Sequence, residues 1–365
     1  MNPADAVFLD RALELAQRGL GSTSPNPPVG AVVVSDGRIV GEGYHHHAGA
    51  PHAEIEALLE AGDNARGATL YVSLEPCAHH GRTPPCTEAI LNSGIARVVG
   101  GVADPTARSA RAGFEILRAR GLEVVNAHSE RGREMIEPFA RAARSERPYI
   151  ALKLAVSLDG FVASKPNLQE WLTSEEARAF VRDLRIAHDA LAVGAQTVRI
   201  DNPQLTVRPP HDRELPYARV VFCQASSLPA QSKIFAAQNG YAKTTVVAPA
   251  SARAMFGEIE RVADLVWIEG DPEEGLNLMQ ALRALRSRGI SSLLCEGGPT
   301  LASRLIDCGL VDRFYWIVAP RLLGAVGAVR ALSLSAARSI GRLRFDRIEQ
   351  LGADVLISGT FEHDV

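Results

Sequence analysis

Residues 74–86 read Leu-Glu-Pro-Cys-Ala-His-His-Gly-Arg-Thr-Pro-Pro-Cys, and the motif His52-Ala-Glu54 precedes them. Cys77 lies 25 residues after His52, and Cys86 follows nine residues later. A catalytic zinc site takes three protein ligands and leaves a fourth position for water. We therefore interpret His52, Cys77 and Cys86 as zinc ligands. Glu54 would exchange protons with that water as a general acid and base.

The spacing of the two cysteines leaves alternatives open. Zinc base deaminases combine His-x-Glu with Pro-Cys-x-x-Cys, whereas here the cysteines are nine residues apart. The residues could instead be two buried free cysteines and an exposed histidine. They could also form a closed structural zinc site with His79 or His80 as the fourth ligand. We favour the catalytic site because His52 and Cys86 stand at expected helix starts, where the helix dipole favours a thiolate.

The pattern of apolar residues predicts alternating helices and strands in the first part of the chain. The expected helices cover residues 5–18, 52–61, 85–92 and 113–120, and the expected strands cover 29–34, 38–43, 68–74, 97–101 and 122–125. Short links between alternating elements imply a sheet that is covered by helices on both faces.

A polar, arginine-rich stretch at residues 141–148 predicts a domain boundary. We expect an α/β chain with one domain at 1–146 and a second at 147–365, each long enough to bury a core. In the second domain, strands are expected at 149–157, 191–194, 219–222, 244–248, 265–268, 292–296 and 314–319, with a hairpin at 347–362 and a helix at 276–288.

Composition argues against several classes of function. Lys and Arg number 39 against 42 Asp and Glu, with no basic run, so nucleic acid and anionic membranes are poor candidate partners. The N-terminal segment carries acidic residues within its apolar pattern, unlike a signal peptide. No apolar stretch approaches the ~18 residues of a membrane span. Five cysteines, an odd and sparse number, indicate the reducing cytoplasm.

Two local patterns in the second domain suggest ligand binding. On the strand expected at 149–157, large aliphatic residues share one face, and Lys153 stands beside alanines on the other. The chain has only four lysines, so this cation suggests a ligand groove, with a solvent-exposed face as the alternative. Gly297 and Gly298 link a strand to a helix start, where N–H groups bind phosphate, although a tight link is the simpler reading. No Gly-x-Gly-x-x-Gly follows a strand, which argues against a Rossmann domain.

The motifs of the first domain resemble those of the bifunctional riboflavin-biosynthesis deaminase–reductase family. The matching residues are Pro25-Asn26-Pro27-Pro28-Val29-Gly30, Gly43-Tyr44-His45, Pro51-His52-Ala53-Glu54 and the run 74–86 with its widened cysteine spacing. The resemblance implies a cytidine-deaminase-like αβα fold, zinc on His52, Cys77 and Cys86, and Glu54 as proton shuttle. It also implies substrate contacts from Asn26, His45 and Arg82, where arginine suits a phosphate. A turn-forming Asn and a solvated loop are the alternatives for Asn26 and Arg82.

The second domain resembles the reductase half of the same family, which implies a dihydrofolate-reductase-like α/β fold and NADPH as cofactor. The matching stretches are 152–160, 194–208, 296–298 and 319–324. The implied cofactor-binding residues are Ala155, Trp171, Thr197, Asp201, Gly298, Pro299, Thr300, Leu301, Ala302, Ser303 and Arg304. The implied substrate-binding residues are Gln169, Arg185, Leu205, Arg208 and Glu296, with the arginines on the phosphate. Lys153 and Asp201 are our catalytic candidates.

The reductase resemblance is incomplete before Trp171. The family usually has a glycine and a serine there, whereas this chain has Lys-Pro-Asn-Leu-Gln-Glu at 165–170. The alternative for Thr197 and Asp201 is a pair of turn residues, and the alternative for Trp171 is a core side chain.

The resemblance implies two consecutive reactions. The first is zinc-dependent hydrolytic deamination of diaminohydroxyphosphoribosylaminopyrimidine. The second is NADPH-dependent reduction of the ribosyl chain of 5-amino-6-(5-phosphoribosylamino)uracil to ribityl. One alternative is a single-activity deaminase whose second domain binds a ligand or mediates oligomerisation. Another is a nucleic-acid base editor, which needs basic and aromatic surfaces. The low aromatic content of 5% does not favour this alternative. We expect a cytoplasmic homo-oligomer that acts on a small phosphorylated pyrimidine.

Overall fold

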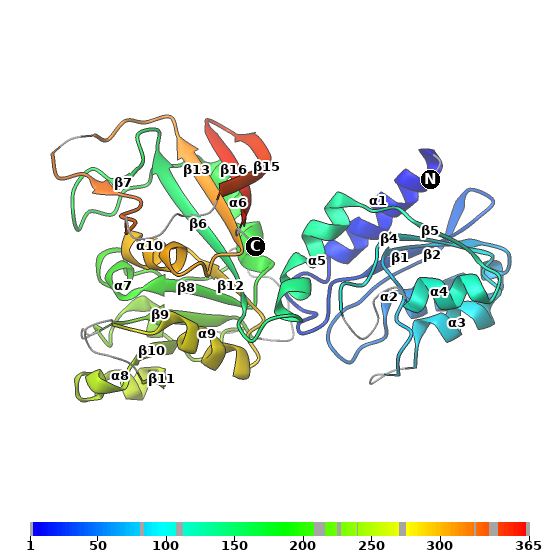
Figure 1. Ribbon diagram of the computed structural model, residues 1–365, viewed down its shortest axis with the longest axis horizontal. Helices are drawn as coiled ribbons and strands as arrows, with labels where there is room; N and C mark the ends of the chain where they lie inside the picture. The colour runs from blue at the N-terminus through cyan, green and yellow to red at the C-terminus, as the bar shows by residue number, and fades with distance from the viewer. Residues whose placement is uncertain are drawn as a thin grey trace. The chain divides into compact units, whose positions relative to one another are not determined.

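The computed structural model describes residues 3–80, 84–106, 112–207, 216–224, 228–238, 240–269, 275–324, 326–335 and 342–362. The chain divides into two compact units, Met1–Ser145 and Glu146–Val365. Each unit is built around a sheet with helices on its faces (Figure 1). Within these ranges, no helix is both long enough and apolar enough to cross a membrane.

The first unit contains one mixed sheet. Its helices are α1 (Pro3–Gln17), α2 (Ala53–Ala61), α3 (Cys86–Ser93), α4 (Ala112–Ala119) and α5 (Glu130–Ala142), with a 3-10 turn η1 (Gly62–Ala65). Its strands are β1 (Gly30–Ser35), β2 (Arg38–Tyr44), β3 (Thr69–Leu74), β4 (Arg97–Val102) and β5 (Glu123–Asn126). The sheet order is β2-β1-β3-β4-β5. Strand β1 is antiparallel to both neighbours, and β3, β4 and β5 are parallel.

Helices cover both faces of this sheet, which confirms the expectation from the alternating pattern. On one face, Leu13 of α1 packs with Val32 of β1, and α5 lies on the same side (Figure 1). On the other face, Ala57 of α2, Ile90 of α3 and Leu117 of α4 belong to one core cluster. The elements that carry the candidate zinc ligands are therefore fixed by packing on a single face.

The close approach of α2 to β2 depends on a glycine. A Cβ atom at Gly43 would lie 2.5 Å from the carbonyl oxygen of Ala53. Because no side chain tolerates that separation, only glycine lets the first turn of α2 lie against β2. This contact fixes the position of His52, which is the N-cap residue of α2.

The second unit contains a larger, mostly parallel sheet. Its helices are α6 (Glu175–Ile186), α7 (Ala195–Asp201), α8 (Ile259–Val262), α9 (Leu278–Ser287) and α10 (Pro299–Asp307), with 3-10 turns η2 (Lys233–Phe235) and η3 (Ala250–Met255). Its strands are β6 (Tyr149–Ser157), β7 (Phe161–Ala163), β8 (Ala190–Gly194), β9 (Ala218–Phe222), β10 (Thr245–Pro249), β11 (Asp264–Ile268), β12 (Ser292–Cys295), β13 (Arg313–Ala319), β14 (Val329–Arg330), β15 (Arg342–Leu351) and β16 (Asp354–Glu362). In the described part of the chain, the sheet order is β11-β10-β9-β8-β12-β6-β13-β16-β15. The neighbouring strands β11, β10, β9, β8, β12, β6 and β13 run parallel to one another. Strand β16 is antiparallel to β13 and β15, and β7 pairs with β14 outside this sheet.

Strand β6 lies inside this sheet, and both of its faces are covered. Leu152 and Leu154 belong to a core formed with α9 and α10. Tyr149 and Ala151, on the opposite face, belong to a second core formed with α6 and α7. Because side chains alternate along a strand, Lys153 lies on that second face. The alternative that this face is exposed to solvent is therefore wrong.

The helices α5, α6, α7 and α8 are not predicted by the apolar pattern. Helix α5 contains Pro138, a residue that normally interrupts a helical pattern because it lacks an N–H donor. For α5 and α6 the missed signal is capping, since Ser129 accepts the N–H of Gly132 at the start of α5 and Ser174 accepts that of Ala177 at the start of α6. Helix α7 follows Gly194, which makes no side-chain cap.

Candidate active sites

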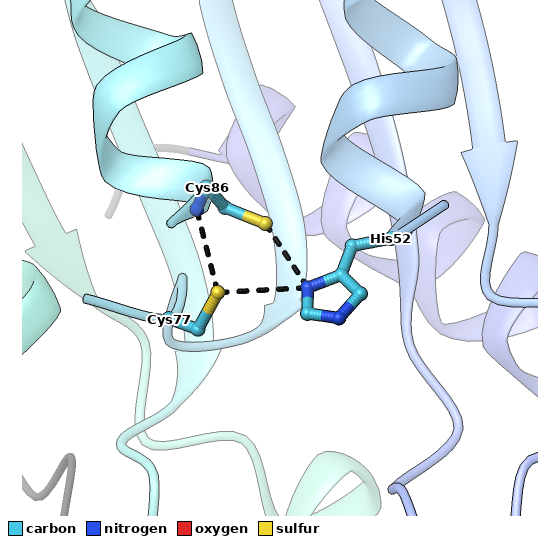
Figure 2. Close-up of side chains that lie close together, drawn as sticks. All are labelled: His52, Cys77 and Cys86. Atoms are coloured by element: carbon cyan, nitrogen blue, oxygen red, sulfur yellow. Dashed lines mark hydrogen bonds between the residues drawn. The ribbon is translucent and has the colours of Figure 1, made fainter. Parts of the chain in front are cut away.

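Three side chains from separate elements meet in the first unit. His52 precedes α2, Cys77 follows β3, and Cys86 is the first residue of α3. His52 Nδ1 lies 3.1 Å from Cys86 Sγ and 3.5 Å from Cys77 Sγ. Figure 2 shows the two sulfur atoms and Nδ1 turned toward one another, and all three atoms lie within 4.8 Å. The fold thus brings together the residues that the sequence analysis selected as ligands.

The cluster fits a zinc ion by both donor type and spacing. One imidazole nitrogen and two thiolates suit zinc, and such ligands on a tetrahedral ion are about 3.5 Å apart. Among the described residues, the cluster contains three side chains. His80 instead lies 3.6 Å from Glu88. Three ligands favour an open catalytic site over the closed structural site that would need His79 or His80.

The thiols of Cys77 and Cys86 differ in the direction of their pKa shifts. A hydrogen bond from the Cys86 thiol lowers the pKa of Cys77 to about 4, and His52 acts in the same direction. Cys77 Sγ also accepts the backbone N–H of Cys86 at 3.3 Å. The pKa of Cys86 is raised because its thiol donates to Cys77 and is buried. A bound dication would hold both sulfurs as thiolates.

Glu54 lies beside this cluster in the first turn of α2 and is 3% exposed. Burial raises the pKa of Glu54, whereas the charge of His52 and a hydrogen bond with Cys86 lower it. A raised pKa favours the protonated form of this carboxyl. The geometry therefore suits the acid–base role that the sequence analysis gives to Glu54.

His45 connects Asn26 to the same region. His45 Nδ1 lies 3.0 Å from the carbonyl oxygen of Pro51, so Nδ1 carries the hydrogen because a carbonyl only accepts. Nε2 then accepts from the amide nitrogen of Asn26 at 3.1 Å. Burial lowers the pKa of His45, which favours this neutral form. The His45 ring lies edge-on to that of His52, with 5.3 Å between centroids.

Glu75 has a structural role at this site that the sequence analysis does not assign. Its carboxylate accepts the backbone N–H groups of Asp104 and Phe114, each at 2.9 Å. These bonds tie the end of β3 to the start of α4 and to the loop that follows β4. They thereby help to position Cys77, two residues further along the chain. The sequence signal for this role is the position of Glu75, a carboxylate between a strand expected to be buried and the proposed ligand Cys77.

A charged cluster forms the centre of the second site. Arg185, in the last turn of α6, pairs with Glu296 through Nε at 2.5 Å and Nη2 at 2.8 Å. Burial lowers the pKa of Lys153, Glu296 raises it, and Arg185 lowers it. Burial raises the pKa of Glu296, but Arg185 and Lys153 outweigh burial and bring it below its usual value. The cluster thus places two basic side chains, Arg185 and Lys153, beside one carboxylate.

The segment 203–207 lies against the same cluster. Arg185 donates its Nη1 to the carbonyl oxygen of Thr206 at 2.6 Å. Leu205 is buried and has a φ of 52°, a left-handed conformation that a leucine rarely adopts. Four of the residues predicted or proposed for the reductase site, Lys153, Arg185, Leu205 and Glu296, are thus close together.

The candidate cofactor residues gather where β8 and β12 end. Thr197 Oγ1 accepts the N–H of Gly298 at 3.0 Å, and Gly194 N–H donates to Gly297 O at 3.1 Å. The peptide bond between Gly297 and Gly298 is cis. Asp201 lies one helical turn beyond Thr197 on α7, and burial raises its pKa.

The rest of the predicted cofactor segment forms the first part of α10. Pro299 and Thr300 lie toward the surface, whereas Leu301 and Ala302 are packed in the core. Ser303 donates to Pro299 O, and Arg304 donates to Leu276 O. Ala155 is half-buried on β6, on the same face as Lys153.

Two predicted residues, Trp171 and Gln169, are not brought into these clusters by the described contacts. Trp171 is 70% exposed, so the alternative of a core residue is wrong. Its ring lies beneath Arg178, with the guanidinium carbon 5.9 Å from the centroid. Gln169 is also exposed. Arg82 and Arg208 lie outside the described residues.

Both units match known protein families. Residues 3–102 match the cytidine and deoxycytidylate deaminase zinc-binding region, and residues 148–357 match the RibD C-terminal domain. The riboflavin biosynthesis protein RibD of Aquifex aeolicus is 39% identical over 354 residues, which cover 97% of each chain. That of Escherichia coli is 37% identical over 363 residues, which cover 97% of this chain and 98% of the relative.

Solved structures agree over nearly the whole length. A Thermotoga maritima diaminohydroxyphosphoribosylaminopyrimidine deaminase/5-amino-6-(5-phosphoribosylamino)uracil reductase is 34% identical with a TM-score of 0.84, covering 98% of this chain and 99% of that one. Acinetobacter baumannii RibD is 34% identical with a TM-score of 0.81, covering 99% of both chains. The similarity thus spans both units and both candidate sites.

Proposed function

Because this chain belongs to the RibD family and is a bifunctional deaminase and reductase of riboflavin biosynthesis, we propose that each unit carries one complete active site. The first would hydrolyse the ring amino group of diaminohydroxyphosphoribosylaminopyrimidine. The second would reduce the ribosyl chain of 5-amino-6-(5-phosphoribosylamino)uracil with NADPH. The observation that carries the proposal is that the His52–Cys77–Cys86 cluster and the Lys153–Arg185–Glu296 cluster lie in different units.

In the first unit, we assign zinc binding to His52, Cys77 and Cys86. Zinc, when bound, would act as a Lewis acid on a water molecule. Glu54 accepts a proton from that water and delivers one to the amino group, so that the ring carbon gains oxygen and ammonia leaves. Asn26 donates its amide N–H to His45, which leaves its amide oxygen to accept from an N–H of the pyrimidine.

In the second unit, we assign the substrate phosphate to Arg185 and Arg208, with Gln169, Leu205 and Glu296 as further contacts. NADPH, when bound, would supply a hydride to the first carbon of the ribosyl chain. Lys153 is the group that donates a proton to the ring oxygen as its bond to that carbon breaks. The product is an open ribityl chain, and the lysine regains its proton from solvent.

The cofactor assignment rests on the arrangement around Thr197, Asp201 and the start of α10. The first turn of a helix has N–H groups without partners inside the helix, and these groups bind phosphate readily. Thr300 in that turn is exposed and follows the two glycines. These features fit a dinucleotide phosphate, and Ala155 lies on the sheet surface nearby.

We further propose that the deaminase domain covers residues 1–146 and the reductase domain 147–365. The sparse cysteines support a cytoplasmic location. A homo-oligomer is supported by the edge strand β15, where Leu343, Phe345 and Ile348 are exposed. Light scattering after size-exclusion chromatography measures the assembly directly.

The test of the function combines metal analysis with two separate assays on purified protein. We expect about one zinc per chain, release of ammonia from the diaminopyrimidine, and oxidation of NADPH on the deaminated substrate. A protein that releases ammonia but leaves NADPH unchanged on deaminated substrate would support the single-activity alternative. NADH in place of NADPH measures cofactor preference.

A further inference from the structure

We propose that Tyr241 is a positioning residue for the reductase, because its hydroxyl holds the segment 203–207 that orients Arg185 toward the substrate. The inference rests on the proposed function of the second unit, in which Arg185 and Leu205 contact the substrate. Tyr241 lies just before β10 and is far in the sequence from every residue assigned to the site.

The segment 203–207 follows α7 and belongs to neither a helix nor a strand. Leu205, Thr206 and Val207 are nevertheless buried, with exposures of 4%, 5% and 3%. Leu205 is held at a positive φ, a conformation that persists only when surrounding contacts impose it. The segment therefore depends on bonds from neighbouring elements.

Two such bonds are present, one on each side of the peptide between Thr206 and Val207. The carbonyl oxygen of Thr206 accepts from Arg185 Nη1 at 2.6 Å. The N–H of Val207 donates to the Tyr241 hydroxyl at 2.7 Å. Because a peptide group is planar and rigid, the hydroxyl that holds its N–H also fixes the direction of its carbonyl.

Tyr241 is itself held firmly. Its ring stacks on Tyr217 with 5.6 Å between centroids and an interplanar angle of 27°, and the two residues form a parallel bridge. On its ring lies Arg219, whose guanidinium carbon is 5.3 Å from the centroid and whose side chain is 1% exposed. A stacked ring with a buried cation over it has little freedom to rotate, so its hydroxyl is a fixed point for the segment.

The guanidinium group of Arg185 is consequently held on two sides. Nε and Nη2 bind Glu296, and Nη1 binds the carbonyl that Tyr241 indirectly orients. Loss of the Tyr241 hydroxyl would leave the buried N–H of Val207 without its acceptor and let the segment turn. The guanidinium group of Arg185 would then tilt away from the substrate. Thr197 and α10, which we assign to NADPH, would keep their contacts.

The test is Tyr241→Phe, which removes the hydroxyl and retains both the stack on Tyr217 and the contact with Arg219. We expect KM for the deaminated substrate to rise about tenfold, since an unsatisfied buried donor is costly. The kcat, the KM for NADPH and ammonia release should stay within about twofold. Thr244→Val is the matched control, because Thr244 is 1% exposed and donates its hydroxyl to Ile234 O and not to the segment 203–207.

An unchanged substrate KM in Tyr241→Phe overturns the inference, and so does an equal rise in Thr244→Val, which would indicate a general loss of packing. Arg185→Ala separates this result from a failure of the proposed site. If Arg185→Ala raises the substrate KM and Tyr241→Phe does not, the inference alone is wrong. If Arg185→Ala has no effect, the assignment of the substrate site is wrong and the inference is overturned with it.

Discussion

Replacement of Lys153 by methionine separates a role in catalysis from a role in packing. Methionine keeps the apolar stem and removes the charge. Within the cluster, Glu296 is already paired twice with Arg185, and we assign Lys153 as the group that donates a proton to the substrate. A hydrogen bond to a charged group contributes about 1.5–3 kcal/mol. We therefore expect kcat/KM for the deaminated substrate to fall about 10- to 150-fold.

The same substitution should not destabilise the protein. Burial lowers the pKa of Lys153 in the folded state, so the unfolded chain binds this proton more tightly. The folded wild type is therefore penalised relative to Lys153→Met at pH values below about 10.4, the value for a free lysine. The difference in Tm should favour the variant at pH 7 and shrink as the pH approaches 10.

The assays are loss of NADPH absorbance with deaminated substrate and thermal unfolding followed by circular dichroism from pH 7 to 10. Lys233→Met is the control, since Lys233 is exposed on η2 and its charge lies outside the cluster. Reductase kinetics within twofold of the wild type would refute the placement of Lys153 in the site. A fall in Tm of several degrees at pH 7 would indicate that the ammonium stabilises the fold instead.

Three further predictions concern the first site and its independence from the second. Glu54→Gln should retain zinc, measured by metal analysis, and lose about 10²- to 10⁴-fold in deamination, as expected for a general acid and base; loss of the metal would make Glu54 a ligand. Removal of zinc with a chelator should stop ammonia release and leave NADPH oxidation intact, and full deamination by metal-free protein would contradict the zinc assignment. His52→Ala should lose only deamination and Asp201→Asn only reduction, because the two residues lie in separate units and sites that share no partners act independently within about 0.3–0.5 kcal/mol; joint loss in either well-folded variant would show that the sites are coupled.

The zinc cluster was the part of the site most accessible from sequence. Its ligands sit in short motifs, and each motif borders a helix or strand whose apolar pattern is strong. The spacing between Cys77 and Cys86 did not prevent them from meeting, because Cys86 begins α3 and α3 packs on the same face as α2.

The second site was less accessible because its members are far apart in the chain. Arg185 and Glu296 are separated by 111 positions, and α6, which carries Arg185, was not predicted. The face of β6 that holds Lys153 looked like a possible solvent face because alanines do not distinguish an exposed strand from a covered one. The positive φ of Leu205 had no sequence signal, since the residues that impose it belong to other elements.

The contact between Gly43 and α2 has a consequence for how the enzyme tolerates variation. A single added methyl group on β2 would meet the backbone of α2 directly, and the helix start that carries His52 would have to move. A mutational scan scored by ammonia release should therefore show intolerance at a position that touches neither metal nor substrate. Efforts to reshape the deaminase for other pyrimidines would do better to vary the side chains proposed to contact the substrate and to leave Gly43 unchanged.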